Sequence, residues 1–326
     1  MDMPQPRAMA STCVGCHALS RDGSRISVGT DIPTSAFAVF DVTTRAQIFR
    51  NPAAGGFAFP SQPDFASWSP DNSMIVQSGL TGLRIIDGTT GMTVTDNITG
   101  QPASMPDWGP DMNRIVYAKS TSVGPVAGLA DALSIKDGSI VLAENTGGTW
   151  GPGPTLVAAD HDNNYYPAFS PDDGWVAFAR SFCKAGDNPN GDINESVCDT
   201  YDDGTARVLA VSAKGGAPVD LARANGTGRL KNSWPKWSPF KGTYKGGDIY
   251  WLTISSARDY GLRVKHTQDG QGNPVGNVQL WLVAFDPAKA AAGVDPSFAP
   301  VWLPFQSVQS SNHIGQWTTK IVGPIK

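Results

Sequence analysis

The chain has 326 residues, of which 40% are hydrophobic and only 17% are charged, with 36 glycines and 25 prolines. This composition favours many short strands joined by turns and argues against a mainly helical protein. The formal net charge is −4 and no basic run occurs, so nucleic acid is not an expected partner. No apolar run reaches the roughly 18 residues that would predict a membrane span.

The first distinctive motif follows an N-terminal arm, residues 1–12, that contains no apolar segment of a signal peptide. Cys13, Cys16 and His17 spell C-x-x-C-H, the attachment motif of a c-type haem. Its two thiols can form thioethers to one macrocycle, and the histidine can ligate the iron. A dithiol redox site would need a strand before the motif and a helix after it, and a zinc site would need a second ligand pair. The remaining alternative is that the two cysteines have only a structural role. We predict one covalently attached haem c.

A repeat then runs along the chain: an aromatic residue or leucine, a Ser or Gly, a Pro-Asp-like turn and a short apolar strand. The anchor residues of its copies are Leu19, Trp68, Trp108, Phe169, Trp237 and, without the Pro-Asp turn, Trp317. Proline presets the backbone of such a turn, and Asp or Asn can accept a bond from a downstream amide. Further strand-like runs after each turn give about four antiparallel strands per copy, which is one blade of a β-propeller.

The fold prediction is therefore all-β: a single propeller over residues 13–326 with four-stranded blades. We expect six blades, the last one rudimentary, with five blades plus a strand as the next possibility. A pair of β-sandwiches is the alternative fold. The incomplete last blade leaves a sheet edge that could support self-association.

The S-P-D-x-x-x-[IV] copies resemble the TolB-like β-propeller repeats, and the similarity spans Leu19 to Trp317. That resemblance implies that the residues just before each anchor form the innermost strand, which lines the central channel. It thereby places Cys13, Cys16 and His17 at one mouth of the channel. The motif in the first copy is similar to a bacterial branch of exported monohaem cytochromes. The resemblance implies no particular reaction, because TolB-like propellers serve mostly as binding platforms.

The second ligand of the haem iron comes from a short set of candidates, since the chain has only 4 histidines. His313 is favoured, because closing the ring would set the last copy beside the first. His161, His266 and Met105 are alternatives, as is an iron with no second protein ligand.

Two long insertions, residues 181–204 and 255–276, are expected to stand around the haem and cover it. The first contains Cys183 and Cys198, which we expect to pair as a disulfide in an oxidising compartment. Oxygen-bearing side chains between these cysteines indicate either a calcium loop or a solvated acidic loop. The candidate calcium ligands are Asp187, Asn188, Asn190, Asp192 and Asn194.

Together these features predict an exported c-type cytochrome, periplasmic or at the cell surface, that transfers electrons between redox partner proteins. An electron carrier is favoured over an enzyme, because no distal Arg-His pair is recognisable and no catalytic residue is predicted. The alternatives are a five-coordinate haem enzyme or ligand sensor, and an interaction platform with a structural haem.

Overall fold

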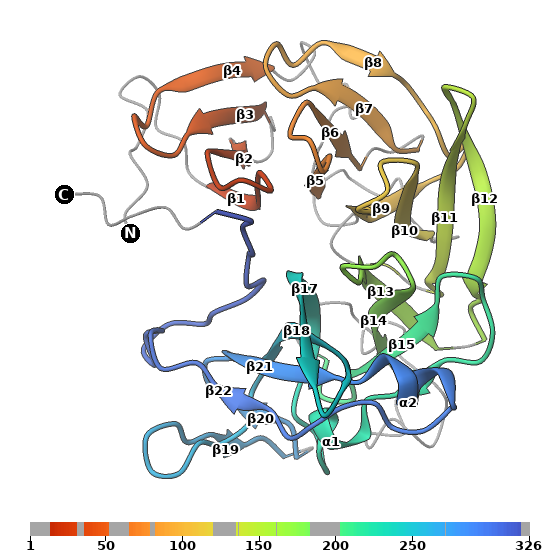
Figure 1. The fold of residues 1–326 in the computed structure, drawn as a ribbon. Coiled ribbons are helices and arrows are strands. Elements are labelled where there is room, and N and C mark those ends of the chain that lie inside the picture. The colour runs from red at the N-terminus through yellow and green to blue at the C-terminus, as the bar shows by residue number, and fades with distance from the viewer. Residues whose placement is uncertain are drawn as a thin grey trace.

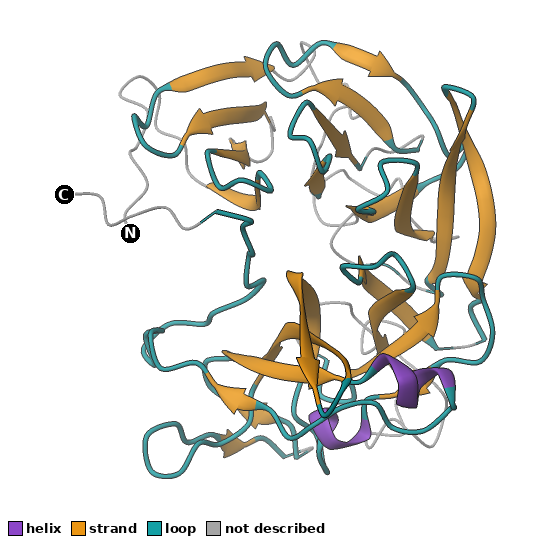
Figure 2. Cartoon of the chain, viewed as in Figure 1, coloured by secondary structure: helices purple, strands orange, loops and turns teal. Residues whose placement is uncertain are grey.

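The computed structural model describes residues 14–30, 36–51, 65–78, 82–119, 135, 137–160, 162–182, 203–270 and 272–320. Within these ranges the strands form five four-stranded antiparallel sheets, arranged as blades around a common centre (Figure 1). Almost all the regular structure is strand, and two short helices, α1 (Ala222–Asn225) and α2 (Pro287–Ala291), lie beside the fifth sheet (Figure 2). The predicted all-β propeller with four-stranded blades is confirmed.

Each sheet is a meander whose first strand lies innermost (Figure 1). The first sheet consists of β1 (Val14–Leu19), β2 (Arg25–Thr30), β3 (Ala36–Asp41) and β4 (Gln47–Asn51). The second consists of β5 (Ala66–Trp68), β6 (Met74–Gln77), β7 (Arg84–Asp87) and β8 (Thr93–Thr95). The third consists of β9 (Ala103–Trp108), β10 (Arg114–Lys119), β11 (Ser139–Thr146) and β12 (Thr149–Val157).

The last two sheets follow the same order, with one insertion. The fourth consists of β13 (Asn163–Phe169), β14 (Trp175–Ser181), β15 (Arg207–Ser212) and β16 (Val219–Asp220). The fifth consists of β17 (Ser233–Tyr244), β18 (Gly247–Ser256), β21 (Gln279–Phe285) and β22 (Val301–Trp302). A separate hairpin of β19 (Thr267–Gln268) and β20 (Pro274–Val275) is inserted between β18 and β21.

The repeated turn between the first two strands of a sheet is held by its serine and aspartate. In the second copy the Ser69 hydroxyl donates to Asp71 at 2.6 Å, and the N–H of Met74 donates to the Ser69 hydroxyl at 2.9 Å. Burial alone would raise the pKa of Asp71, but the bonds from Ser69 and Ser73 lower it below 3.8. The next residue, Asn72, has a φ of 63°. Asparagine tolerates this left-handed conformation better than most residues, which explains its place in the motif.

The hydrophobic core lies between neighbouring sheets. Separate clusters of buried side chains join the first sheet to the second, the second to the third, the third to the fourth and the fourth to the fifth. The anchor tryptophans sit in these seams and reach across them. The indole Nε1 of Trp68 donates to the carbonyl of Ala18 at 3.1 Å, and that of Trp237 donates to the carbonyl of Ala168 at 3.0 Å. Each such bond contributes about 1 kcal/mol, so burial of the indole is the larger stabilising effect.

The prediction of six blades is wrong: the structure has five, and residues 303–320 contain no strand. This C-terminal segment instead runs from the fifth sheet across to β1 (Figure 1). Trp317 keeps the role of an anchor, because its Nε1 donates to Thr253 Oγ1 at 3.3 Å on the fifth sheet. The segment then meets the first sheet, where the N–H of Thr319 donates to the carbonyl of Arg21 at 2.7 Å. One unpaired segment therefore closes the ring.

The insertion 255–276 does not cover the channel mouth. Tyr260 stacks on Trp302 of β22 with ring centroids 4.9 Å apart, and Arg263 lies over the same indole. The ring of His266 is held within this part of the chain, with Nδ1 3.2 Å from Asp259 and Nε2 3.0 Å from the carbonyl of Asn277. The insertion therefore packs against the outermost strand of the fifth sheet and not over the channel, where it was expected. Most of the insertion 181–204 lies outside the described residues.

Candidate functional site

The innermost strands share a β-bulge near their anchors. In β1, β9, β13 and β17 the pairing register shifts within the four residues that precede the anchor. We call the residue three before each anchor the bulge position. It is occupied by Cys16, Phe65, Met105, Tyr166, Trp234 and Ile314. Four of these residues have a left-handed backbone: Met105, Tyr166, Trp234 and Ile314, with φ from 49° to 55°.

This conformation is costly for a side chain larger than glycine, so the surrounding sheets must impose it. Its effect is to bring bulge-position side chains together at one mouth of the channel. The rings of Tyr166 and Trp234 stack with centroids 3.5 Å apart at 19°, and Phe65 lies 5.8 Å from Tyr166 and 6.0 Å from Trp234. The sulfur of Met105 accepts the N–H of Tyr166 at 3.4 Å.

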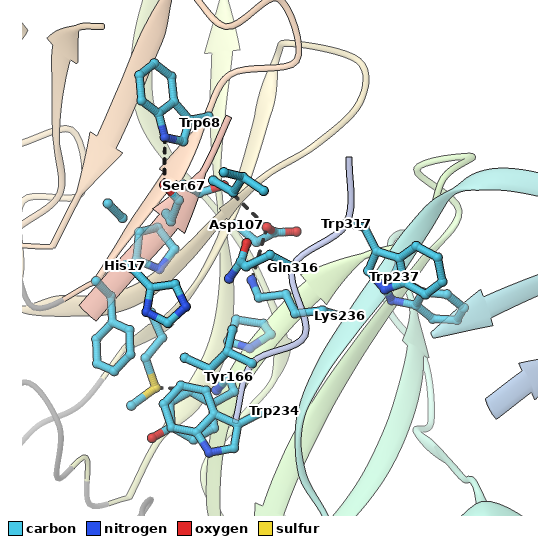
Figure 3. Close-up of a pocket in the computed structure, with 18 of the residues that line it drawn as sticks. His17, Ser67, Trp68, Asp107, Tyr166, Trp234, Lys236, Trp237, Gln316 and Trp317 are labelled. Atoms are coloured by element: carbon cyan, nitrogen blue, oxygen red, sulfur yellow. Dashed lines mark hydrogen bonds and ion pairs between the residues drawn. The ribbon is translucent and has the colours of Figure 1, made fainter. Parts of the chain in front are cut away.

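These side chains line one part of a pocket that is partly open to solvent (Figure 3). Its lining comes from all five innermost strands or the residues beside them, and from the C-terminal segment.

His17 belongs to this lining, and Figure 3 shows its imidazole directed into the pocket. It lies two residues before its anchor. The same place in the other five copies is held by small or cyclic side chains, namely Ala66, Pro106, Pro167, Pro235 and Gly315. Part of His17 is in contact with solvent, but the pocket walls desolvate the imidazole and lower its pKa from 6.5. The ring is therefore mainly neutral at pH 7, which is the form that ligates metals.

The other part of the pocket is polar and is built mainly from residues one before an anchor, namely Ser67, Asp107, Lys236 and Gln316, together with Arg21. Asp107 is 5% exposed and lies 3.4 Å from the ammonium of Lys236 and 3.7 Å from the guanidinium of Arg21. Ser67 donates to the same carboxylate at 3.3 Å. Figure 3 shows Gln316 beside this group. The pocket thus has an aromatic side, formed by residues at the bulge positions, and a charged side, whose ion pairs and hydrogen bonds connect several blades.

The structure brings only some of the predicted site residues to this pocket. His17 and Met105 line it, whereas His313 contacts it from outside, with its ring 6.2 Å from that of Trp234. Cys16 lies in β1, directly before His17. Cys13 and His161 lie outside the described residues. The predicted disulfide of Cys183 and Cys198 and the candidate calcium loop, residues 187–194, lie outside them as well.

The sequence interpretation missed the aromatic wall of Phe65, Tyr166 and Trp234 and the charged group around Asp107. Their spacing to the anchors could have indicated these residues. The aromatic residues lie three residues before an anchor, and Asp107 and Lys236 lie one residue before an anchor. In the described part of the chain, no cluster of three or more His, Cys, Asp or Glu side chains is placed to hold a metal ion.

Among known proteins, no family model and no curated sequence matches this chain. Solved structures do. A TolB protein from Agrobacterium tumefaciens aligns over 94% of this chain and 86% of its own, with 15% identity and a TM-score of 0.50. Hydrazine synthase from Kuenenia stuttgartiensis aligns over 94% of this chain and 72% of its own, with 14% identity and a TM-score of 0.49.

At these sequence identities the similarity concerns the fold alone. The comparison with the TolB protein, which has the higher TM-score, supports the fold assignment. The fold is that of a TolB-like β-propeller, as the repeats predicted. No helix among the described residues is long and apolar enough to cross a membrane.

Proposed function

We propose that this chain is an exported c-type cytochrome that carries one covalently attached haem and transfers electrons between partner proteins. The observation that carries the proposal is the place of His17. The histidine of a C-x-x-C-H motif points into a pocket with aromatic walls, at a position that the other copies fill with Ala, Pro or Gly.

The residues of the pocket suit a flat apolar cofactor. Cys13 and Cys16 would hold the macrocycle through thioether bonds, and His17 would ligate the iron through its neutral imidazole. Phe65, with the stacked rings of Tyr166 and Trp234, would exclude water from one side of the group. Bound there, the haem would supply one-electron redox chemistry.

Each of these residues has a defined task in electron transfer. The lowered pKa of His17 keeps its imidazole ready to bind iron at neutral pH, without competition from a proton. The apolar wall limits access of water to the cofactor and so influences its potential. The part of the pocket open to solvent gives a partner protein a short route to the haem.

The proposal is tested on protein produced in a bacterial host that matures c-type cytochromes in its periplasm. The haem should remain with the polypeptide on a denaturing gel, and the protein should be reduced and reoxidised reversibly by small donors and acceptors. Cys13→Ser combined with Cys16→Ser should abolish the haem stain. Cys183→Ser is the matched control and should leave it unchanged.

Three outcomes contradict the proposal in different ways. A matured protein without bound haem would overturn the cofactor assignment. A ferrous protein that binds carbon monoxide readily would instead support a ligand-binding haem enzyme or sensor. Haem that is attached but exchanges electrons with no partner would leave the structural platform as the explanation.

A further inference from the structure

One methionine sulfur lies in the same pocket as His17. Met105 occupies the bulge position of β9, its side chain lines the pocket, and the residue is 3% exposed. Among the lining residues that the structure describes, only His17 carries an imidazole and only Met105 carries a thioether. These two groups form the iron ligand pair typical of many c-type cytochromes, so their meeting in one pocket needs an explanation.

The placement of Met105 is fixed by the fold. Its left-handed backbone, with φ of 54°, turns the side chain away from the path of the strand. The N–H of Tyr166 then donates to the sulfur at 3.4 Å. A thioether sulfur is a weak acceptor with more than one lone pair, so this bond orients the sulfur and leaves it able to bind a metal.

The other candidates for a second ligand are less well placed. His313 contacts the outer side of the pocket through Trp234 and does not belong to the lining. Both ring nitrogens of His266 have partners near the outer edge of the fifth sheet. The ammonium of Lys236 lies in the pocket but is paired with the carboxylate of Asp107 at 3.4 Å, so it is engaged in that ion pair.

We propose that Met105 would serve as the second iron ligand, in place of the predicted His313; this inference rests on the proposed function. An iron with imidazole and thioether ligands has a higher reduction potential than one with two imidazoles. It is also six-coordinate, so it excludes external ligands. The chain would accordingly act as an electron carrier and not as a ligand sensor.

The test uses the matured holoprotein and two substitutions of Met105. Met105→Leu conserves volume and removes only the sulfur, and Ile314, with φ of 49° at its bulge position, shows that a branched side chain is accepted there. This variant should lose the thioether-to-iron absorption band and bind carbon monoxide in the ferrous state. Met105→His should restore a low-spin iron closed to carbon monoxide, with a lower reduction potential than the unaltered protein.

The matched controls are Met74→Leu and His313→Ala. Met74 is a partly buried methionine of β6 in the seam between the second and third sheets, away from the pocket. Neither control should change the spectrum. If His313→Ala opens the iron and Met105→Leu does not, the assignment to Met105 is wrong and His313 is the ligand.

A measurement on the unaltered protein keeps the inference testable even if the variants fold poorly. Near-infrared magnetic circular dichroism of the ferric form distinguishes an imidazole–thioether iron from an iron with two imidazoles and from a high-spin iron. Only the first result supports Met105. The haem stain of the denatured protein separates the two proposals: a stained protein with a different ligand pair overturns Met105 alone, whereas an unstained one overturns the cytochrome assignment.

Discussion

Removing the charge of Asp107 should weaken the whole ring, because this carboxylate links several blades at the channel. Its Oδ2 accepts the N–H of Phe169 at 2.9 Å, while Oδ1 accepts the Ser67 hydroxyl at 3.3 Å. Lys236 at 3.4 Å and Arg21 at 3.7 Å neutralise it. Asp107→Asn conserves the shape and the oxygen that Phe169 needs, so the variant isolates the effect of charge.

The size of the effect follows from burial. Breaking a fully buried ion pair by removing one partner costs about 3–5 kcal/mol. The side chain of Asp107 is 7% exposed, but those of Arg21 and Lys236 are 33% and 27% exposed, so both cations regain some hydration. We therefore expect Asp107→Asn to lower the free energy of unfolding by about 2–3 kcal/mol.

The assay is urea unfolding at pH 7, followed by tryptophan fluorescence, with the slope of the transition checked for each variant. Asp111→Asn is the matched control, because Asp111 binds Arg114 at 2.7 Å but its side chain is 34% exposed. This control should lose less than about 1 kcal/mol. Equal losses in the two variants would refute the view that the charged group at the channel stabilises the ring.

Three further predictions concern a turn, the ring closure and the insertion. Burial and the nearby Asp111 raise the pKa of Asp173 from 3.8 to about 6 in the folded protein. At pH 7 the folded protein must hold this carboxyl in its charged form, so the group lowers the free energy of unfolding. Below pH 4 the carboxyl is protonated in the folded protein, and this loss of stability disappears. In urea unfolding, Asp173→Asn should raise the free energy of unfolding at pH 7 by at most about 3 kcal/mol and have little effect at pH 4. The turn accepts asparagine, because Asn72 occupies the same turn position in the second copy. Thr319→Pro removes both the N–H and the hydroxyl that donate to the carbonyl of Arg21 and should cost about 1–2 kcal/mol in the same assay; no change would mean that these contacts do not hold the ring closed. Peptide mapping without reduction should find Cys183 joined to Cys198, a bond that stabilises a loop of this size by about 3 kcal/mol; alkylation of both in the native protein would exclude it.

The five sheets could be predicted because their signals are local. Anchors such as Trp68 and Trp237 precede a turn whose proline and aspartate fix the backbone, and alternating apolar residues then define the paired strands. The sixth copy misled the prediction because Trp317 looks like the other anchors. It lacks the turn that would fold a second strand back onto the first, and a strand without a partner does not form a blade.

The pocket was predictable only in part. The motif placed His17 at the channel mouth, and the spacing of Met105 to Trp108 made it a candidate. The left-handed backbone at Tyr166 and Trp234 was beyond the reach of sequence reasoning, because both residue types avoid this conformation unless tertiary packing imposes it. The spacing to the anchors could have placed Asp107 and Lys236 on the channel, but not shown that these charges meet, because they come from different copies.

The measurement that tests the central claim most directly is the mass of one tryptic peptide from the natively matured protein. Cleavage after Arg7 and Arg21 releases residues 8–21, which contain Cys13, Cys16 and His17. The account predicts that this peptide carries the mass of one haem and has no thiol left to alkylate. The unmodified peptide with two alkylated cysteines would contradict it.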